Sequence, residues 1–356
     1  MGLDNYYHDQ PLFGLDIGYS SIKVMQFEIE NNKQPKVMGY GMTKFAPEAI
    51  VNGQIANYDV LSKALYDLFK SQINGQVYTR RVSCSLPTSH TFSRLMRIPE
   101  MPDKDISEAI RLEAEQYIPM PVDSLYIDHE VFARTADGIQ LLMVATPKVI
   151  VDSYIKLLES LDLEPVALEP SVNATSRLFG LSNPAETFPV MLIDLGAVAI
   201  DVAVFDPAMI VNSTLSGGSE LMTKLVSQRL KIDRQAAFDM RSKYGIGVSD
   251  NQQQVEDAIL PILDNLLKEV RKITRYYNER VGQSQRKISR IVTSGGGANM
   301  PGINEFLSKK LHLPAATLNP WPGFDFGSIK HPTELEQPAY LTVAGAALLK
   351  PGEIFG

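Results

Sequence analysis

The stretch FGLDIGYSSIKVMQF, residues 13–27, decides the fold of this chain of 356 residues. Its first five positions alternate between apolar residues and glycine or aspartate, which is the period-2 pattern of a half-buried β-strand. Residues 18–21 then supply turn-forming side chains and an apolar segment follows them, so the stretch predicts a β-hairpin. Asp16 ends the first strand, and Gly18 lies two residues later, where bare backbone N–H groups can cradle an anion.

A second stretch, VMLIDLGAVAIDVAVF at residues 190–205, has the same arrangement. Asp194 ends its first strand and Gly196 lies two residues later. A carboxylate at such a turn can hold Mg²⁺ through water, because Mg²⁺ keeps much of its hydration shell. A single aspartate-x-glycine turn between apolar strands is most often a plain hairpin. Two copies, with Lys23 inside the first, predict a duplicated architecture that clamps a phosphate between its halves.

Two glycine-rich turns add to this pattern. In residues 291–303, IVTSGGGANMPGI, a strand opens through three glycines into an amphipathic helix. Glycines at a strand–helix turn let a flat ring or a phosphate lie against bare backbone. Residues 216–219, SGGS, precede a helix predicted at residues 220–230. The N-terminus of that helix is either an anion or ribose site or an ordinary N-cap.

The stretches at residues 13–27, 190–205 and 291–303 resemble the phosphate-1, phosphate-2 and adenosine motifs of the actin-like ATPase fold. Actin, Hsp70, sugar kinases and the division protein FtsA share this fold. Two further stretches, EAIRLEAEQYIPMP at residues 108–121 and LLMVATPKVIVDSYIKLLESLDLEPVALEP at residues 141–170, are most similar to the PilM family. PilM proteins are the cytoplasmic actin-like components of type IV pilus assembly machines. The resemblance extends from about residue 12 to residue 349.

This resemblance implies an α/β fold of the actin-like (RNase H-like, duplicated) ATPase type, in two domains. Domain 1 is expected at residues 11–182, with an inserted FtsA/PilM-type subdomain 1C at about residues 80–147. Domain 2 is expected at residues 188–356. Its helix at about residues 338–349 is expected to return to domain 1 and to pack there through small residues.

The resemblance also implies a site for ATP or ADP with Mg²⁺. The expected phosphate-binding residues are Gly18, Tyr19, Ser20, Ser21, Lys23, Gly196, Ala197 and Val198. The expected nucleoside-binding residues are Gly217, Gly218, Arg241, Gly295, Gly296, Gly297 and Ala298. Asp16 and Asp194 are expected to orient the water shell of the metal ion. No residue is assigned a catalytic role.

The chain departs from the family pattern at two places. After Gly196 the residues Ala197, Val198 and Ala199 stand where actin-like ATPases usually have small or hydroxylated residues that bind phosphates. Backbone amides can still serve there, but hydroxyl contacts are absent, which predicts at most slow ATP hydrolysis. Arg241 stands where a lysine is expected, and Phe238 where an acidic residue is expected, beside the adenosine.

Composition excludes several classes of protein. The net charge of −7 argues against a dedicated nucleic-acid binder, which would carry a basic face. The basic row on residues 268–275 is interspersed with acidic residues and is interpreted as the solvated face of a helix. Cys84 is the only cysteine, so it forms no intramolecular disulfide. No run of about 18 apolar residues occurs, and the polar N-terminus is unlike a signal peptide. These features predict a cytoplasmic protein.

Three functions compete. The leading hypothesis is an ATP-binding adaptor that takes the cytoplasmic N-terminal peptide of a PilN-like inner-membrane protein into a groove between subdomain 1C and the first subdomain, and is thereby recruited to the inner face of the cytoplasmic membrane. The resemblance names pilus extension and retraction ATPases, and other copies of the chain, as further partners.

Two alternatives follow from the wider superfamily. An FtsA-like filament protein would need an amphipathic C-terminal membrane helix, and residues 348–356 look too short and too broken to form one. A sugar-kinase-type phosphotransferase would need a carboxylate base beside a substrate cleft. The sequence places no acidic residue that argues for this role.

Overall fold

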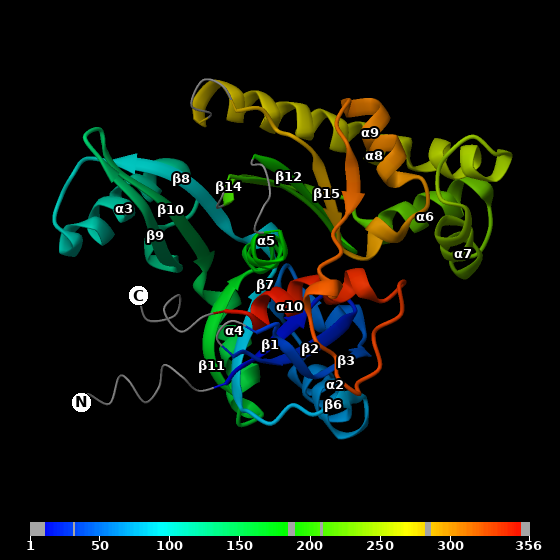
Figure 1. The fold of residues 1–356 in the computed structure, drawn as a ribbon, viewed down its shortest axis with the longest axis horizontal. Coiled ribbons are helices and arrows are strands. Elements are labelled where there is room, and N and C mark those ends of the chain that lie inside the picture. Colours follow the sequence, from blue (N-terminus) through cyan, green and yellow to red (C-terminus); the bar gives the residue numbers. More distant parts are fainter. Residues whose placement is uncertain (1–10, 31–32, 184–188, 207–208, 282–285, 350–356) are drawn as a thin grey trace.

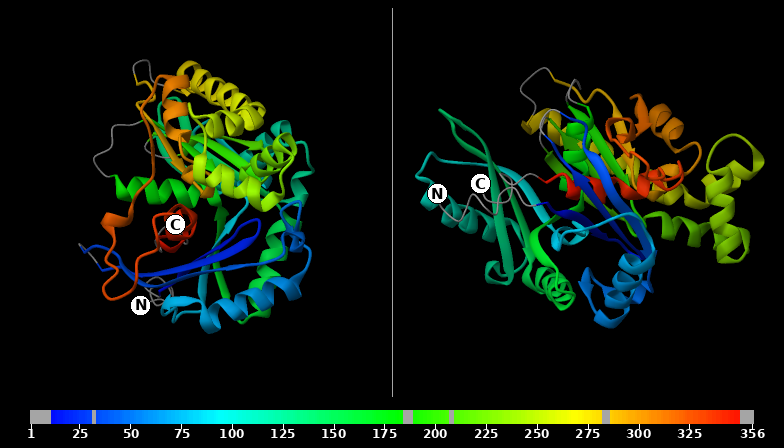
Figure 2. Two further views of the ribbon diagram at one scale, coloured as in Figure 1. Left: turned by 90° about the vertical axis from the view of Figure 1, so that its right-hand side faces the viewer. Right: turned by 60° about the horizontal axis from the view of Figure 1, so that its bottom comes forward.

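The computed structural model describes residues 11–30, 33–183, 189–206, 209–281 and 286–349. These residues form a mixed α/β molecule in which two β-sheets face each other across a central pair of helices (Figure 1). Further helices cover the outer face of each sheet, so the molecule has five layers. The central pair is α5 (Ser171–Ser182) and α10 (Leu341–Ala347), which lie between the two halves in Figure 2.

The first sheet has the strand order β11-β7-β1-β2-β3-β6. Its strands are β1 (Phe13–Ile17), β2 (Ser21–Glu28), β3 (Lys36–Lys44), β6 (Ile73–Gly75), β7 (Arg81–Leu86) and β11 (Glu164–Pro170). Strands β1, β2 and β3 are antiparallel neighbours, whereas β7 runs parallel to β1 and β11 runs parallel to β7. The outer face is covered by α2 (Tyr58–Ser71) and α4 (Lys148–Ser160). A small hairpin, β4 (Ile50–Val51) and β5 (Gln54–Ile55), precedes α2.

The second sheet repeats this plan with the order β14-β13-β12-β15-β16. Its strands are β12 (Val190–Leu195), β13 (Ala199–Phe205), β14 (Met209–Ser216), β15 (Ile291–Ser294) and β16 (Ala315–Thr317). The outer helices are α6 (Ser219–Leu230), α7 (Arg234–Tyr244), α8 (Asp250–Tyr276) and α9 (Ile303–Leu311). In both sheets a hairpin continues antiparallel into a third strand and pairs in parallel with a later one. The duplication that the two hairpins predict is therefore confirmed.

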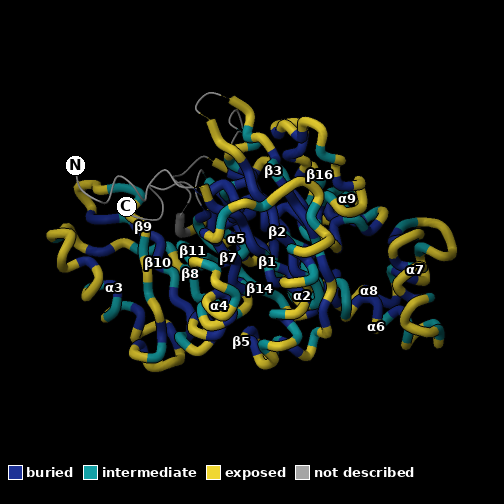
Figure 3. The backbone as a smooth tube through the Cα atoms, turned by 90° about the horizontal axis from the view of Figure 1, so that it is seen from below, coloured by how far each residue is buried: buried dark blue, intermediate teal, exposed yellow. Residues whose placement is uncertain are grey.

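A three-stranded module projects from the first sheet, between β7 and α4 in the chain (Figure 1, left). Its strand order is β8-β10-β9. Its elements are β8 (Phe92–Ile98), α3 (Asp103–Tyr117), β9 (Leu125–Thr135) and β10 (Gly138–Pro147). The module has an apolar core of its own, in which α3 buries Ile106, Ile110 and Ala114 against the sheet. Figure 3 shows that buried backbone is concentrated at the two large sheets and that α3 and α7 carry much of the exposed surface.

The central helices pack closely because glycines remove side chains at their contacts. A β-carbon added at Gly345 of α10 would lie 1.9 Å from the carbonyl oxygen of Ala174 in α5. One added at Gly14 of β1 would lie 2.3 Å from the carbonyl oxygen of Val343. The small residues of the returning segment thus hold it against the first sheet. The structure begins this segment with a short 3₁₀ helix, Gln337–Tyr340, and continues it as α10.

The structure differs from the sequence-based expectations in several elements. Strand β14 was not expected. The sequence predicts that a helix ends near Ile73, whereas Ile73–Gly75 forms a strand beside β3. Pro261 predicts a kink or a fresh start in the helical pattern of residues 252–277, and α8 continues through it. No helix within the described residues is both long enough and apolar enough to cross a membrane. Residues 1–10 and 350–356, on which the expectations about the two ends rest, lie outside the described residues.

The contact between α10 and α5 gives a stability prediction. We expect Gly345→Ala to lower the free energy of unfolding by about 2 kcal/mol or more, because the new methyl group overlaps a backbone carbonyl that cannot move aside cheaply. Urea unfolding of the purified variant measures this loss. Gly323→Ala is the matched control, since an added β-carbon there meets no atom within 4 Å. Equal effects of the two substitutions would contradict the packing argument.

Candidate functional site

A cavity of about 520 Å³ opens between the two sheets, where the turns of both hairpins meet. All ten residues expected to bind phosphate or metal line it together, namely Asp16, Gly18, Tyr19, Ser20, Ser21, Lys23, Asp194, Gly196, Ala197 and Val198. Gly295 and Gly296, which were expected to bind the nucleoside, line it as well. The cavity is within the size range of small-molecule sites. Two hairpins far apart in the sequence thus contribute to one site.

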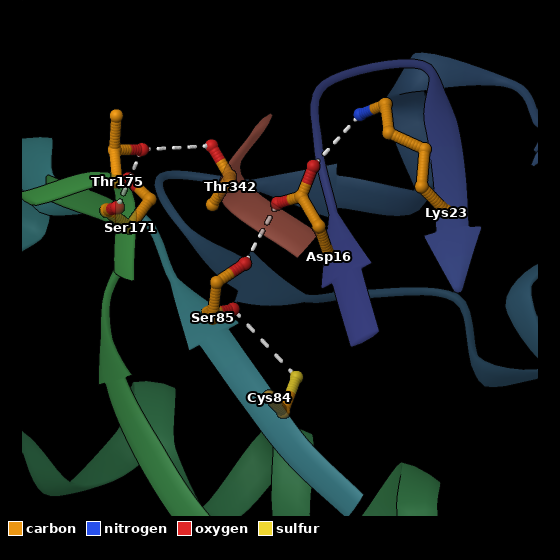
Figure 4. A network of polar contacts seen from close by, with 7 residues as sticks. All are labelled: Asp16, Lys23, Cys84, Ser85, Ser171, Thr175 and Thr342. Atoms are coloured by element: carbon orange, nitrogen blue, oxygen red, sulfur yellow. Dashed lines mark hydrogen bonds and ion pairs between the residues drawn. The ribbon is translucent and has the colours of Figure 1, made fainter. Parts of the chain in front are cut away.

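Asp16 is held by two partners on neighbouring strands of the first sheet (Figure 4). Lys23 lies opposite it across the β1–β2 hairpin, and its Nζ is 2.8 Å from Asp16 Oδ2. Ser85, opposite it on the parallel strand β7, donates a hydrogen bond of 2.7 Å to Asp16 Oδ1. Both carboxylate oxygens are therefore oriented, and the ammonium group lies at the cavity wall.

The second hairpin places an aspartate where the first has a lysine. Asp201 lies opposite Asp194 in the same register that pairs Lys23 with Asp16. Both carboxyl groups line the cavity. Burial, together with the nearby carboxylates of Asp201 and Asp16, raises the pKa of Asp194 to about 7, while Lys23 opposes this rise. Burial raises the pKa of Asp201 to about 6, against a hydrogen bond from Thr214.

The cavity therefore gathers three carboxyl groups, Asp16, Asp194 and Asp201, and one ammonium group, Lys23. Such an excess of acid attracts a cation and is relieved by one. Across the described ranges, no three histidine, cysteine, aspartate or glutamate side chains converge closely enough to hold a metal ion directly. These carboxyl groups suit a hydrated cation, which they would contact through its water molecules while an anion in the same cavity contacts it directly.

The turn of the second hairpin, residues 196–198, is fixed by α6. The backbone N–H groups of Ser219 and Glu220 donate to the carbonyls of Gly196 and Ala197 at 2.9 Å each, and the N–H of Gly217 donates to the carbonyl of Val198 at 3.0 Å. Because N–H and C=O point in opposite directions in a trans peptide, the amides of Ala197 and Val198 are turned away from α6. Ala197 and Val198 both line the cavity, so their amides are available on the side away from α6.

The first amides of α6 are consequently not free for an anion. Gly217 and Gly218 do not line the cavity, in contrast to what a nucleoside-binding role for the helix N-terminus would suggest. A β-carbon at Gly218 would lie 2.4 Å from the carbonyl oxygen of Gly196, so this glycine permits the close approach of α6 to the turn. Sequence reasoning could not find this role, because it depends on tertiary contact between the two segments.

The glycine run after β15 packs against the end of β12. A β-carbon at Gly295, whose φ is +78°, would lie 2.1 Å from Asp194 Oδ1. One at Gly297 would lie 2.8 Å from the β-carbon of Leu195. A β-carbon at Gly296 would meet no atom within 4 Å, and this glycine lines the cavity. Gly297 and Ala298 are buried and do not line it.

Arg241 lies apart from the cavity. Its side chain is buried, its Nε donates a hydrogen bond of 3.2 Å to Thr223 Oγ1, and burial lowers its pKa. The guanidinium lies 5.6 Å from the ring of Phe238 on the same helix. Arg241 thus joins α7 to α6 in this structure.

Several cavity residues were missed in the sequence, among them Asp201 and His90. Asp201 follows Asp194 by seven positions, as Lys23 follows Asp16, so the spacing could have revealed it. His90 lies in the short helix Thr88–His90 and lines the cavity with its ring against Gly53. Burial lowers the pKa of His90, so its imidazole is neutral at pH 7. No local pattern in the sequence distinguishes it.

Comparison with known proteins places this site in a family context. The family model described as "Type IV pilus assembly protein PilM" matches residues 14–350. The cell division protein FtsA of Neisseria meningitidis serogroup B (strain ATCC BAA-335 / MC58) is 22% identical over 348 residues, which covers 85% of this chain and 82% of that protein.

Two solved structures show the fold. A PilM–PilN type IV pilus biogenesis complex contains a chain of TM-score 0.82 and 21% identity, with 95% of this chain and 98% of that chain covered. MreB5 of Spiroplasma citri bound to AMPPNP has a TM-score of 0.53 and 10% identity, with 95% of each chain covered. The actin-like architecture predicted from the three motifs is therefore confirmed.

The buried carboxyl group of Asp194 gives a pH-dependent prediction. Its pKa in the folded chain lies above the ordinary value of 3.8, so its contribution to stability is greatest below about pH 4 and is lost as the pH rises through about 7. We expect Asp194→Asn to raise the free energy of unfolding at pH 8 by about 2 kcal/mol, and to have little effect at pH 5.

Urea unfolding at both pH values measures this difference. Asp264→Asn is the control, because Asp264 is an exposed aspartate on α8 that lies outside the cavity. A gain of the same size at pH 5 and pH 8 would show that the charge on Asp194 is not its cause.

Proposed function

Because the chain belongs to the family of the type IV pilus assembly protein PilM, we propose that it is an ATP-binding assembly protein of a type IV pilus machine that binds the N-terminal peptide of a PilN-like membrane protein. The observation that carries the nucleotide part is the convergence of both hairpin turns, Lys23 and three carboxyl groups on one cavity. The MreB5 complexes with AMPPNP and with ADP support the choice of ligand.

The phosphates would lie between the two hairpin turns. Lys23 and the backbone amides of residues 18–21 would contact them from one side, and the amides of residues 196–198 from the other. Lys23 is now paired with Asp16, so a phosphate group would compete with that carboxylate for the ammonium group. Charge-assisted hydrogen bonds of this kind are among the stronger polar contacts.

A hydrated Mg²⁺ ion would meet Asp16 and Asp194, with Asp201 as a third acidic group at the same cavity. The ion would favour the ionised forms of Asp194 and Asp201, whose pKa values are raised mainly by burial. The nucleoside would lie against the backbone of Gly295 and Gly296, where Gly296 leaves open space, and Gly297 and Ala298 would support this turn from behind. Gly217, Gly218 and Arg241 would act indirectly, by holding the phosphate turn and the α6–α7 pair in place.

Hydrolysis would be slow in this proposal. The phosphate turn has no hydroxyl group at Ala197, Val198 or Ala199. Nucleotide would then act mainly by stabilising one arrangement of the two sheets, which requires that it binds the alternative arrangements unequally.

The peptide would bind at the outer edge of β9 in the module. Within the described chain β9 pairs only with β10, so its other edge offers backbone groups to an extended segment. This edge lies next to α4, because Tyr126 donates a hydrogen bond of 3.0 Å to Asp152 and Lys148 Nζ lies 5.4 Å from the Tyr126 ring. The printed description of the PilM–PilN complex supports the choice of partner, and that partner would recruit the chain to the membrane.

The proposed phosphate contact gives a binding prediction. We expect Lys23→Met to weaken the binding of Mg-AMPPNP at least tenfold, because it removes a charged contact worth about 1.5–3 kcal/mol. Isothermal titration measures the affinity, and Lys63→Met, an exposed lysine on α2, is the control. Unchanged affinity in the Lys23 variant would remove the phosphate assignment.

The acidic pair predicts how this affinity depends on pH. A cation binds the ionised carboxyl groups, so we expect Mg-AMPPNP affinity to rise about tenfold or more between pH 6 and pH 8, as Asp194 and Asp201 lose their protons. Titration of the γ-phosphate contributes to the same rise. Asp201→Asn removes the contribution of Asp201 and leaves those of Asp194 and the γ-phosphate, so the difference between the two pH profiles measures the share of Asp201. An identical pH profile in this variant would exclude Asp201 from the site.

The peptide proposal is tested with a synthetic N-terminal segment of the cognate PilN-like protein. Strand addition uses every second backbone N–H of the peptide. Two peptides are therefore compared, one N-methylated at the odd-numbered positions and one at the even-numbered positions. One of them should lose binding and the other should bind nearly as tightly as the unmodified peptide. Equal losses in both peptides would argue against the edge of β9. Binding of nucleotide without any binding of peptide would favour an FtsA-like role.

A further inference from the structure

A second hollow, of about 450 Å³, lies between the module and the second sheet. Its walls come from β8 and the end of α3 on one side, and from β14 and the end of α8 on the other. The connection that follows β7, at residues 88–91, forms the wall between them. This hollow is at the β8 edge of the module, opposite the β9 edge discussed above.

Among the residues that the structure describes, Arg94 is the only charged side chain that lines the hollow. Its guanidinium carbon lies 3.5 Å from the centroid of the Tyr117 ring, so one flat face is covered by the aromatic ring. Among the residues that the structure describes, no carboxylate lies within ion-pair distance of Arg94. A guanidinium stacked in this way keeps its N–H edges free and is well suited to bind a carboxylate through two parallel hydrogen bonds.

An unpaired hydroxyl group lies next to this arginine. The Oγ atom of Ser93 is buried, and in the described part of the chain it has no hydrogen-bond partner. Leaving a buried polar atom unsatisfied costs about 1–3 kcal/mol, so such an atom indicates a missing partner. The remaining walls are rich in hydroxyl and amide groups, from Thr91, Asn212, Ser213 and Thr214.

The two strands that border the hollow are both edge strands. Within the described residues β8 pairs only with β10, and β14 pairs only with β13. Each therefore presents unpaired backbone groups, which can bond to an extended polypeptide. Two tyrosines, Tyr117 and Tyr276, flank the ends of the hollow and add apolar surface.

We propose that this hollow is a second peptide site, which takes an extended segment of a partner protein and pairs an aspartate or glutamate of that segment with Arg94. The carboxylate would accept hydrogen bonds from the free N–H edge of the guanidinium. A hydrogen-bond donor or acceptor of the segment would satisfy Ser93. The absence of acidic side chains among the described lining residues gives the hollow the charge that complements such a segment.

The hollow shares parts of its wall with the phosphate cavity. Thr88 and Ser89 line both spaces. Thr214 lines the hollow, and its hydroxyl donates a hydrogen bond to Asp201, which lines the cavity. A ligand that moves Asp201 therefore moves Thr214, and the effect on the two affinities is reciprocal. This coupling rests on the proposed nucleotide function, whereas the peptide site itself does not.

The peptide site is tested by selection from a random dodecapeptide library displayed on phage. We expect enriched peptides to share an acidic residue. Their affinity should fall at least tenfold for the Arg94→Gln variant of the protein. It should fall by a similar factor when the acidic residue of the peptide is replaced by asparagine or glutamine. Arg97→Gln is the matched control, because Arg97 lies on the same strand but outside the hollow, 3.9 Å from Asp137. Circular dichroism confirms that the variants are folded.

Enriched peptides that bind Arg94→Gln as tightly as the unchanged chain would overturn the proposal, and so would a selection that yields no peptide dependent on Arg94. Acetate and inorganic phosphate are tested as competitors. If either ion displaced the peptide with an affinity equal to that of the peptide, the hollow would be a site for a small anion. That result would also overturn the proposal.

The coupling is tested with the same peptides in the presence and absence of Mg-AMPPNP. We expect nucleotide to change peptide affinity by about fivefold, and expect Thr214→Val to remove most of this change while it keeps the shape of the side chain. A full effect in Thr214→Val would exclude the Thr214–Asp201 contact as the link. Failure of the unchanged chain to bind nucleotide would count against the proposed function, and the Arg94 result would be unaffected.

Discussion

The burial of neighbouring carboxyl groups at the junction of the two sheets is the constraint on which the site depends. Asp16 comes from one sheet, Asp194 and Asp201 come from the other, and Lys23 is the one ammonium group at the cavity in the described chain. The surrounding residues reduce this charge conflict without removing it. Ser85 and Thr214 donate hydrogen bonds to carboxylates, and Asp194 takes up a proton more readily than a free carboxyl group. A site arranged in this way gains stability when a cation arrives, so ligand binding and the arrangement of the two sheets are linked.

The duplication explains why the two halves have different roles. Each hairpin places one residue directly opposite its first aspartate, and that residue is Lys23 in the first half and Asp201 in the second. A serine lies beside the aspartate on the parallel strand in both halves, as Ser85 and Ser294. The backbone plan is thus shared, and the difference at one register position gives the first half an ammonium group and the second half another carboxyl group at the cavity.

Short-range sequence patterns made part of this structure predictable. Period-2 alternation and glycine turns identified both hairpins, and the glycine run after residue 294 marked the third side of the cavity. Features that depend on tertiary contact were not predictable. The N–H groups at the start of α6 bond to the turn at Gly196, and this pairing joins segments that no local pattern connects. Helix α8 continues through Pro261 because Ile259 and Leu263 are both buried in the core, and this burial outweighs the single hydrogen bond that proline removes.

The shared apolar core limits how the two halves can respond to a ligand. One cluster of buried residues joins both sheets, the central helices and the module, through side chains such as Phe27, Phe179, Phe205 and Leu142. Opening the two sheets widely would expose this cluster to water at a cost of about 25 cal/mol for each Å² of apolar surface. Large hinge motions are therefore disfavoured, and smaller shifts at the cavity walls remain. The wall at residues 88–91 and the Thr214–Asp201 contact lie where such shifts would reach the module. A stiff core with a few movable polar contacts at its edge suits an adaptor whose ligand adjusts a binding surface rather than driving a large movement.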